Sequence, residues 1–128
     1  MPSPASSREN GIWVYKTDTL TSPKRGAVKV WNAPSGSAWN RENIWAPELH
    51  FVDGKWYIYY AAGRPGPDGT DAAFTDQRSF VLESVTSDPQ GAYVEKGMLY
   101  TGDTIATGGT PFWAIDVSVA RIGGQLYA

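Results

Sequence analysis

The sequence has no cysteine, which excludes disulfide bridges, reactive thiolates and zinc–thiolate sites. It has a single histidine, His50, which lies within a predicted strand and is interpreted as a packed or edge residue rather than a catalytic base. Lysine and arginine form no cluster larger than Lys24–Arg25, and the net charge is −2, so electrostatic binding to nucleic acids or membrane surfaces is not expected. No apolar run approaches the roughly 18 residues of a membrane-spanning helix. Phosphate-binding glycine loops, nucleophile elbows and H-E-x-x-H zinc motifs are also missing.

The composition favours many short strands in one domain. The chain has 128 residues, of which 41% are hydrophobic and 19% charged, and it contains 6 Trp, 7 Tyr, 14 Gly and 9 Pro. Aromatic residues suit strands, and Gly and Pro suit the turns between them. Residues 1–10 are polar and lack the apolar core of a signal peptide, so we predict a loop or disordered edge there and a single domain over 11–128.

Residues 43–62 predict a β-hairpin. Asp53-Gly54, the dipeptide that most favours a two-residue type I′ turn, lies between "ELHFV" and "KWYIYYAA". This turn predicts that Val52 pairs with Lys55, Phe51 with Trp56, His50 with Tyr57 and Leu49 with Ile58. Such aromatic and β-branched cross-strand pairs stabilise a ladder.

The hairpin pattern occurs again near the end of the sequence. In "WAIDVSVARIGGQLYA", Gly123-Gly124 aligns with Asp53-Gly54 at an offset of about 70 residues. A second, looser repeat has an offset of about 67 residues. It consists of a predicted strand, a Ser/Thr/Asp turn and a proline, and it occurs in "IWVYKTDTLTSP" and in "FVLESVTSDP". A strand-rich unit with this spacing predicts propeller blades, of which the chain would hold roughly two. The alternative is a β-sandwich with two similar hairpins. In a partial propeller, open sheet edges would allow oligomers to form.

Two carboxylates are candidate functional groups because each begins a strand after a loop rich in Gly and Pro. Glu48 follows Trp45-Ala46-Pro47, and Asp116 follows Trp113-Ala114-Ile115. In the repeat alignment Asp116 falls on Ala46. Aromatic rings can stack on sugar faces, and paired carboxyls supply the acid and base of glycosidic cleavage. The alternative is that each carboxylate bonds backbone amides of the incoming loop, which is favoured for Glu48 and equally weighted for Asp116.

At these residues the sequence resembles glycoside hydrolase family 43, five-bladed propeller enzymes that act mainly on polysaccharides containing arabinose and xylose. The resembling segments are "IWAPELHFVDGKWYIYYAA", "SFVLESVTSDPQGAYVEKGMLYTGD" and "WAIDVSVARIGGQLYA", in that order. The α-L-arabinofuranosidase-like branch is the most similar. The resemblance implies an all-β fold that is part of a five-bladed propeller.

The family hydrolyses with inversion, using an Asp general base, a Glu general acid and a second Asp that orients the acid and raises its pKa. The resemblance places the second Asp at Asp116. It makes Trp45 a sugar platform, with Trp113 and Glu48 as further substrate-binding residues. The base Asp has no match before Glu9, and the acid Glu would lie beyond Ala128. We therefore expect the 128-residue chain alone to be inactive.

The resemblance also implies an oligosaccharide or polysaccharide partner and an extracellular or periplasmic location for the full-length form. No cofactor is expected in this chain, and no ligand set for a metal is readable. The family often places calcium on the propeller axis of the complete domain. Two other functions remain open: a non-catalytic carbohydrate-binding or lectin-like propeller, and a protein-interaction module on a β-sandwich.

Overall fold

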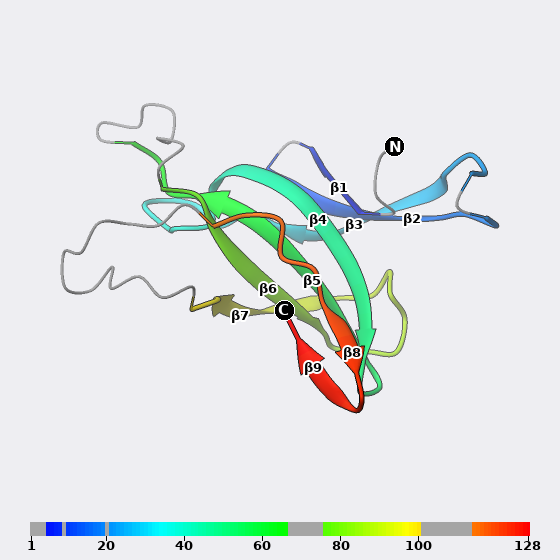
Figure 1. The fold of residues 1–128 in the computed structure, drawn as a ribbon. Helices are drawn as coiled ribbons and strands as arrows, with labels where there is room; N and C mark the ends of the chain where they lie inside the picture. Colours follow the sequence, from blue (N-terminus) through cyan, green and yellow to red (C-terminus); the bar gives the residue numbers. More distant parts are fainter. Residues whose placement is uncertain (1–4, 9, 20, 67–75, 101–113) are drawn as a thin grey trace.

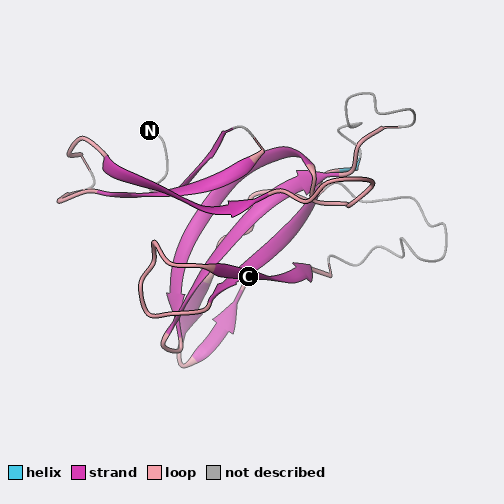
Figure 2. Cartoon of the chain, turned by 180° about the vertical axis from the view of Figure 1, so that it is seen from behind, coloured by secondary structure: helices cyan, strands magenta, loops and turns pink. Residues whose placement is uncertain are grey.

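The computed structural model describes residues 5–8, 10–19, 21–66, 76–100 and 114–128, and in these residues the regular structure is β-strand apart from a short 3₁₀ turn at Asp76 (Figure 2). The strands are β1 (Ala5–Arg8), β2 (Gly11–Lys16), β3 (Arg25–Asn32), β4 (Glu42–Val52), β5 (Lys55–Gly63), β6 (Arg78–Ser84), β7 (Tyr93–Met98), β8 (Ala120–Ile122) and β9 (Gln125–Tyr127). The all-β prediction is confirmed.

The strands form three antiparallel sheets in chain order (Figure 1). The first has the order β1-β2-β3, the second β4-β5-β6-β7, and the third is the β8-β9 hairpin. The middle sheet has the four consecutive antiparallel strands of a propeller blade, with the other two sheets on either side of it in the sequence.

The first predicted hairpin is confirmed in its register. Val52 faces Lys55, Phe51 faces Trp56, His50 faces Tyr57 and Leu49 faces Ile58. Asp53 and Gly54 both have positive φ angles, 48° and 84°, as a type I′ turn requires.

The second predicted hairpin is confirmed as well. In β8-β9, Ile122 faces Gln125 and Arg121 faces Leu126 around Gly123-Gly124. The φ angles of these two glycines are 58° and 85°, close to those of Asp53 and Gly54. The two turns therefore share one backbone conformation.

A hydrophobic core joins the first two sheets. Alternate residues of β5 and β6 point the same way, so that Ile58, Tyr60, Phe80 and Leu82 form one apolar face. This face packs against Ile12, Val14 and Trp31 from β2 and β3 in the same cluster. Tyr60 contacts Trp31 and Phe80 with ring centroids 5.1 and 5.6 Å apart. The opposite face of β6 carries Ser79 and Val81.

One prediction for the N-terminus is wrong. Ala5–Arg8, which we expected within a loop or disordered edge, forms β1 and pairs antiparallel with β2 from Ala5↔Val14 to Arg8↔Gly11. The polar sequence of this segment has no alternating hydrophobic pattern from which a strand could be predicted. The strand forms because its backbone pairs with β2. Residues 1–4 and 9 lie outside the described residues, and the division at residue 10 stays a prediction.

In the described part of the chain, no helix is long and apolar enough to cross a membrane.

Candidate active site

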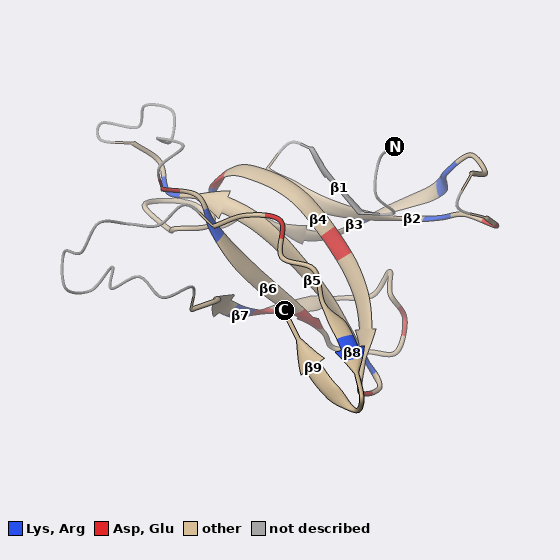
Figure 3. Ribbon diagram, in the orientation of Figure 1, with Lys and Arg blue, Asp and Glu red and all other residues tan. Residues whose placement is uncertain are grey.

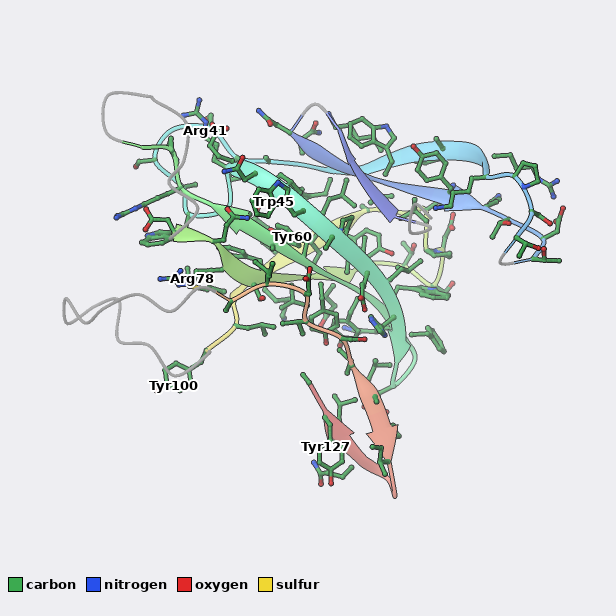
Figure 4. All side chains as sticks on the ribbon, turned by 45° about the horizontal axis from the view of Figure 1, so that its top comes forward. Arg41, Trp45, Tyr60, Arg78, Tyr100 and Tyr127 are labelled. Atoms are coloured by element: carbon green, nitrogen blue, oxygen red, sulfur yellow. The ribbon has the colours of Figure 1, made fainter. Side chains whose placement is uncertain are left out.

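Trp45 lies in β4 at an irregularity of the sheet. Trp45 faces Ala61 while Glu48 faces Tyr59, so two residues of β4 occupy the place of one residue of β5. One of the two, Ala46, has a φ of 45°, a left-handed conformation that is uncommon for a residue with a Cβ. Figure 4 shows Trp45 toward the same end of the four-stranded sheet as Tyr60 and Arg78. The bulge therefore sets the direction in which the half-buried indole leaves the strand.

Glu48 forms a hydrogen bond with a neighbour on its own strand. Its Oε2 lies 2.9 Å from Nε2 of His50, two residues further along the same face of β4. The imidazole in turn meets the ring of Tyr59 edge-on, with centroids 5.7 Å apart. Glu48 is thus held by a side chain, not by the amides of the incoming loop. This arrangement fits a supporting group better than a reacting one.

The side chain of Asp116 differs from that of Glu48 in its exposure and its contacts. Its side chain is exposed, and among the described residues it forms no hydrogen bond or ion pair. Its φ is 59°, close to the 45° of Ala46, the residue on which the repeat alignment places it. Asp116 and Ala46 therefore share a left-handed backbone conformation ahead of the two hairpin turns, and Asp116 presents an exposed carboxylate there.

The segment before Asp116 is bonded to β6. The N–H of Ala114 donates to the carbonyl oxygen of Gln77 at 3.3 Å, and Ser79 Oγ donates to the carbonyl oxygen of Ala114 at 3.1 Å. Gln77 and Ser79 are buried. In Figure 1 this segment, in orange, runs in front of β5 and β6 toward β8.

A second link joins the two hairpins at their turns. Nη2 of Arg121 lies 2.7 Å from Oδ1 of Asp53, and Nη1 of Arg121 donates to the carbonyl oxygen of Gly124 at 2.8 Å. Both charged side chains are exposed, and Figure 3 shows lysine, arginine and acidic residues together at this end of β4, β5 and β8.

A polar network covers the face of β5 and β6 opposite the core. Glu83 accepts hydrogen bonds from Lys55 Nζ at 2.7 Å and from the Tyr57 hydroxyl at 3.1 Å, and Lys96 Nζ lies 3.8 Å away. The hydrogen bond from Lys55 lowers the pKa of the Glu83 carboxyl. Partial burial and the bond to Glu83 raise the pKa of Tyr57. This network places charged side chains on the face of the four-stranded sheet that is opposite the hydrophobic core.

Several buried polar residues at the start of β6 could not be recognised in the sequence. Trp39 has two guanidinium groups over its rings, with the central carbons of Arg64 and Arg78 at 4.3 and 5.7 Å from ring centroids. Arg64 also pairs with Asp76 at 2.8 Å. Arg78 is fully buried, and the buried Oε1 of Gln77 has no hydrogen-bond partner among the residues that the structure describes. A charged residue in a predicted strand gives no sign of such burial.

Of the predicted site residues, the structure places Trp45 and Glu48 on one strand and Asp116 on the segment bonded to β6. Trp113 lies outside the described residues. Within the described ranges, no group of three His, Cys, Asp or Glu residues could hold a metal ion.

The sequence matches Glycosyl hydrolases family 43 over residues 4–128. It is 35% identical over 118 residues to alpha-L-arabinofuranosidase 43 of Humicola insolens, an alignment that covers 80% of this chain and 23% of that protein. It is 31% identical over 121 residues to the probable arabinan endo-1,5-alpha-L-arabinosidase C of Neosartorya fischeri, covering 92% of this chain and 34% of that protein.

A solved structure shows the same fold. The crystal structure of alpha-L-arabinofuranosidase from Lactobacillus brevis superposes with a TM-score of 0.69 at 25% identity, covering 91% of this chain and 35% of that one. The prediction of a partial propeller from this enzyme family is confirmed. The chain spans about a quarter to a third of the length of these relatives.

Proposed function

Because the chain belongs to glycosyl hydrolases family 43, we propose that it forms the part of an inverting α-L-arabinofuranosidase-like enzyme that holds Asp116 and a Trp45 sugar platform. The substrate is an arabinose-containing oligosaccharide or polysaccharide, and the bond broken is an O-glycosidic bond. The coarse activity, glycoside hydrolysis, follows from the family. Inversion, the sugar and the roles of individual residues are the proposal.

The position of Asp116 is the observation that carries this proposal. A carboxylate can be held by backbone amides or by a cationic side chain, or it can remain open to solvent and to ligands. Asp116 is exposed, has neither partner among the described residues, and is held at φ 59°. The carboxylate is therefore open to a ligand, and the resemblance to the family assigns its orienting Asp to this residue.

In the proposed reaction, a carboxylate base removes a proton from water as the water attacks the anomeric carbon. A carboxylic acid on the other side of the sugar protonates the leaving oxygen, and the two carboxyls lie about 6.5–9.5 Å apart. Asp116 is neither group. Its negative charge keeps the acid's pKa high, so that the acid is protonated when the substrate binds. Trp45 stacks on the sugar ring.

The matching segments supply one of the three carboxyls that the family uses. Glu48 does not replace a missing one, because His50 already holds it at 2.9 Å. We therefore expect the 128-residue chain to bind arabino-oligosaccharides weakly and not to hydrolyse them.

The location is proposed from relatives. The exo-alpha-(1->5)-L-arabinofuranosidase of Streptomyces avermitilis, 39% identical over 77 residues, is named as extracellular. Polysaccharides are too large to enter cells, so an extracellular or periplasmic full-length enzyme is consistent with the substrate.

Two measurements on the purified chain test the proposal. The first is turnover of an aryl α-L-arabinofuranoside, which we expect to be undetectable in the wild type and in Asp116→Asn. Turnover that disappears in Asp116→Asn would show that carboxylates within this chain complete a site. The second is titration with arabinotriose, followed by ¹H–¹⁵N NMR of the indole and backbone N–H groups.

We expect arabinotriose to shift the signals of Trp45 and Asp116. Trp45→Ala should weaken binding at least tenfold, whereas Trp13→Phe, a change on β2 in the other sheet, should leave it unchanged. Unshifted Trp45 and Asp116 signals at millimolar arabinotriose would contradict the proposed sugar site.

A further inference from the structure

The side chain of Asp116 lacks a contact that would fix its position. It is exposed and, among the described residues, has no hydrogen bond or ion pair, so its place depends on the backbone on either side of it. On the C-terminal side, β8 begins four residues later, and all its residues are exposed. On the N-terminal side, Ala114 is bonded to β6 through both its backbone polar groups.

Ser79 makes one of these two bonds with its side chain, which is unusual for its place in the sheet. The backbone of Ser79 is already used in the ladder, where it pairs with Ala61 and accepts a hydrogen bond from the N–H of Leu99 at 2.9 Å. Its hydroxyl is free to donate to the carbonyl oxygen of Ala114 at 3.1 Å. The residue is only 1% exposed, so water cannot replace this bond.

The bond also links the four-stranded sheet to the segment that leads to the β8-β9 hairpin. Ser79 belongs to the rigid four-stranded sheet, whose other face is the hydrophobic core, whereas Ala114 precedes the exposed β8-β9 hairpin. The two bonds fix the peptide groups on both sides of Ala114, only two residues before Asp116. Orientation of a catalytic carboxylate within about 0.5 Å depends on such supporting contacts.

We propose that Ser79 is a positioning residue for Asp116: its hydroxyl, with the carbonyl of Gln77, sets where the Asp116 carboxylate stands relative to the four-stranded sheet. The relevance of this position to catalysis rests on the proposed function. The position itself does not, and it can be measured without activity.

The chain offers a matched control. Ser84 lies on the same strand and is also buried, but it faces the other way, and its Oγ accepts a hydrogen bond from the N–H of Trp56 at 3.0 Å. Ser79→Ala and Ser84→Ala each delete one buried hydroxyl of β6 with one hydrogen bond. Only Ser79→Ala removes a bond to the segment before Asp116.

The absence of cysteine makes a distance measurement direct. Spin labels at cysteines introduced at two exposed positions, Ser118 and Val94 in β7, report the distance between the Asp116 segment and the four-stranded sheet by double electron–electron resonance. We expect a narrow distribution in the labelled parent and in Ser84→Ala, one at least twice as wide in Ser79→Ala, and a narrow one again in Ser79→Thr, which keeps the hydroxyl.

An unchanged width in Ser79→Ala would overturn the proposal, as would equal broadening in Ser84→Ala, which would indicate a general loss of rigidity. If the added methyl of Ser79→Thr prevents folding, the comparison of the two alanine variants still decides. The arabinotriose titration is separate: a wild type that binds no sugar contradicts the proposed function, whereas the width in Ser79→Ala tests the role of Ser79.

Discussion

The two hairpins, β4-β5 and β8-β9, share a turn but not an environment. Their turn residues have φ angles of 48° and 84° in one and 58° and 85° in the other. Yet β4 and β5 contain many buried or half-buried residues, whereas every residue of β8 and β9 is exposed. The comparison separates two causes: local sequence determines the turn, and packing against other strands determines how much of the hairpin is buried.

The largest expected effect comes from a core residue of the first hairpin. Ile58 is 0% exposed, so Ile58→Ala leaves a cavity and should lower the free energy of unfolding by about 2–5 kcal/mol. Ile122 in β8 is 65% exposed, and Ile122→Ala should change it by no more than about 0.5 kcal/mol. Urea unfolding followed by tryptophan fluorescence measures both. Equal losses would mean that the second hairpin is as well packed as the first.

Alkaline pH should act on the packed sheets. Burial raises the pKa of Tyr93 to about 12 and also raises that of Tyr60, whereas unfolded tyrosines ionise near pH 10. The raised values stabilise the fold fully below about pH 10, and this contribution is lost as the pH rises from about 10 toward 12. The urea midpoint should therefore fall over this range.

Tyr93→Phe should make that fall less steep. The variant also loses the hydrogen bond from the Tyr93 hydroxyl to the carbonyl oxygen of Pro89 at 2.8 Å, so the pH slopes are compared and not the absolute stabilities. A midpoint that does not change between pH 9 and 12 would show that these hydroxyls are not desolvated.

The shared turn gives the next smaller effect. Gly54 and Gly124 have φ angles of 84° and 85°, and an alanine there costs roughly 1–2 kcal/mol. In Gly54→Ala this strain should appear in global unfolding, because β4 and β5 belong to the core. In Gly124→Ala it should appear as faster amide exchange confined to β8 and β9. A similar global loss in both variants would show that the second hairpin unfolds together with the core.

The smallest effect is expected at the link between the turns. The Arg121–Asp53 pair is 2.7 Å long but exposed on both sides, so Arg121→Ala should cost less than about 1 kcal/mol. The cost should nearly vanish at 1 M salt, where the screening length is about 3 Å. Amide hydrogen exchange in β8, compared between Arg121→Ala and the wild type at low and high salt, measures this cost. A cost that is independent of salt would indicate that the arginine acts by packing.

The sequence predicted the features that depend on residues close together in the chain. The turn dipeptides and the register of Leu49–Val52 on Lys55–Ile58 are local patterns, and the structure confirms both hairpins. The offset that aligns Asp116 with Ala46 is also local, and the structure adds that both residues have a positive φ. The placement of Glu48 beside His50 also follows the two-residue period of a strand, although the sequence did not show whether their side chains would meet.

Contacts between distant segments could not be predicted. The bond from Ser79 to Ala114 joins residues 35 apart, and a serine in an apolar strand gives no sign of its partner. The burial of Arg78 beside Trp39 depends on loops that meet only in the fold. β1 was missed for the same reason, because its pairing with β2 supplies the bonds that its own polar sequence does not suggest.

The left-handed conformation shared by Ala46 and Asp116 has a consequence for protein engineering. Alanine tolerates a φ of 45° poorly, whereas asparagine and aspartate adopt such angles several times more often than other residues with a Cβ. The four-stranded sheet thus already has the backbone of a carboxylate-bearing blade, with a methyl group in place of the acid. The single substitution Ala46→Asp would place an acidic group in the four-stranded sheet. It would also reduce the backbone strain at this φ angle, and no loop would need to change.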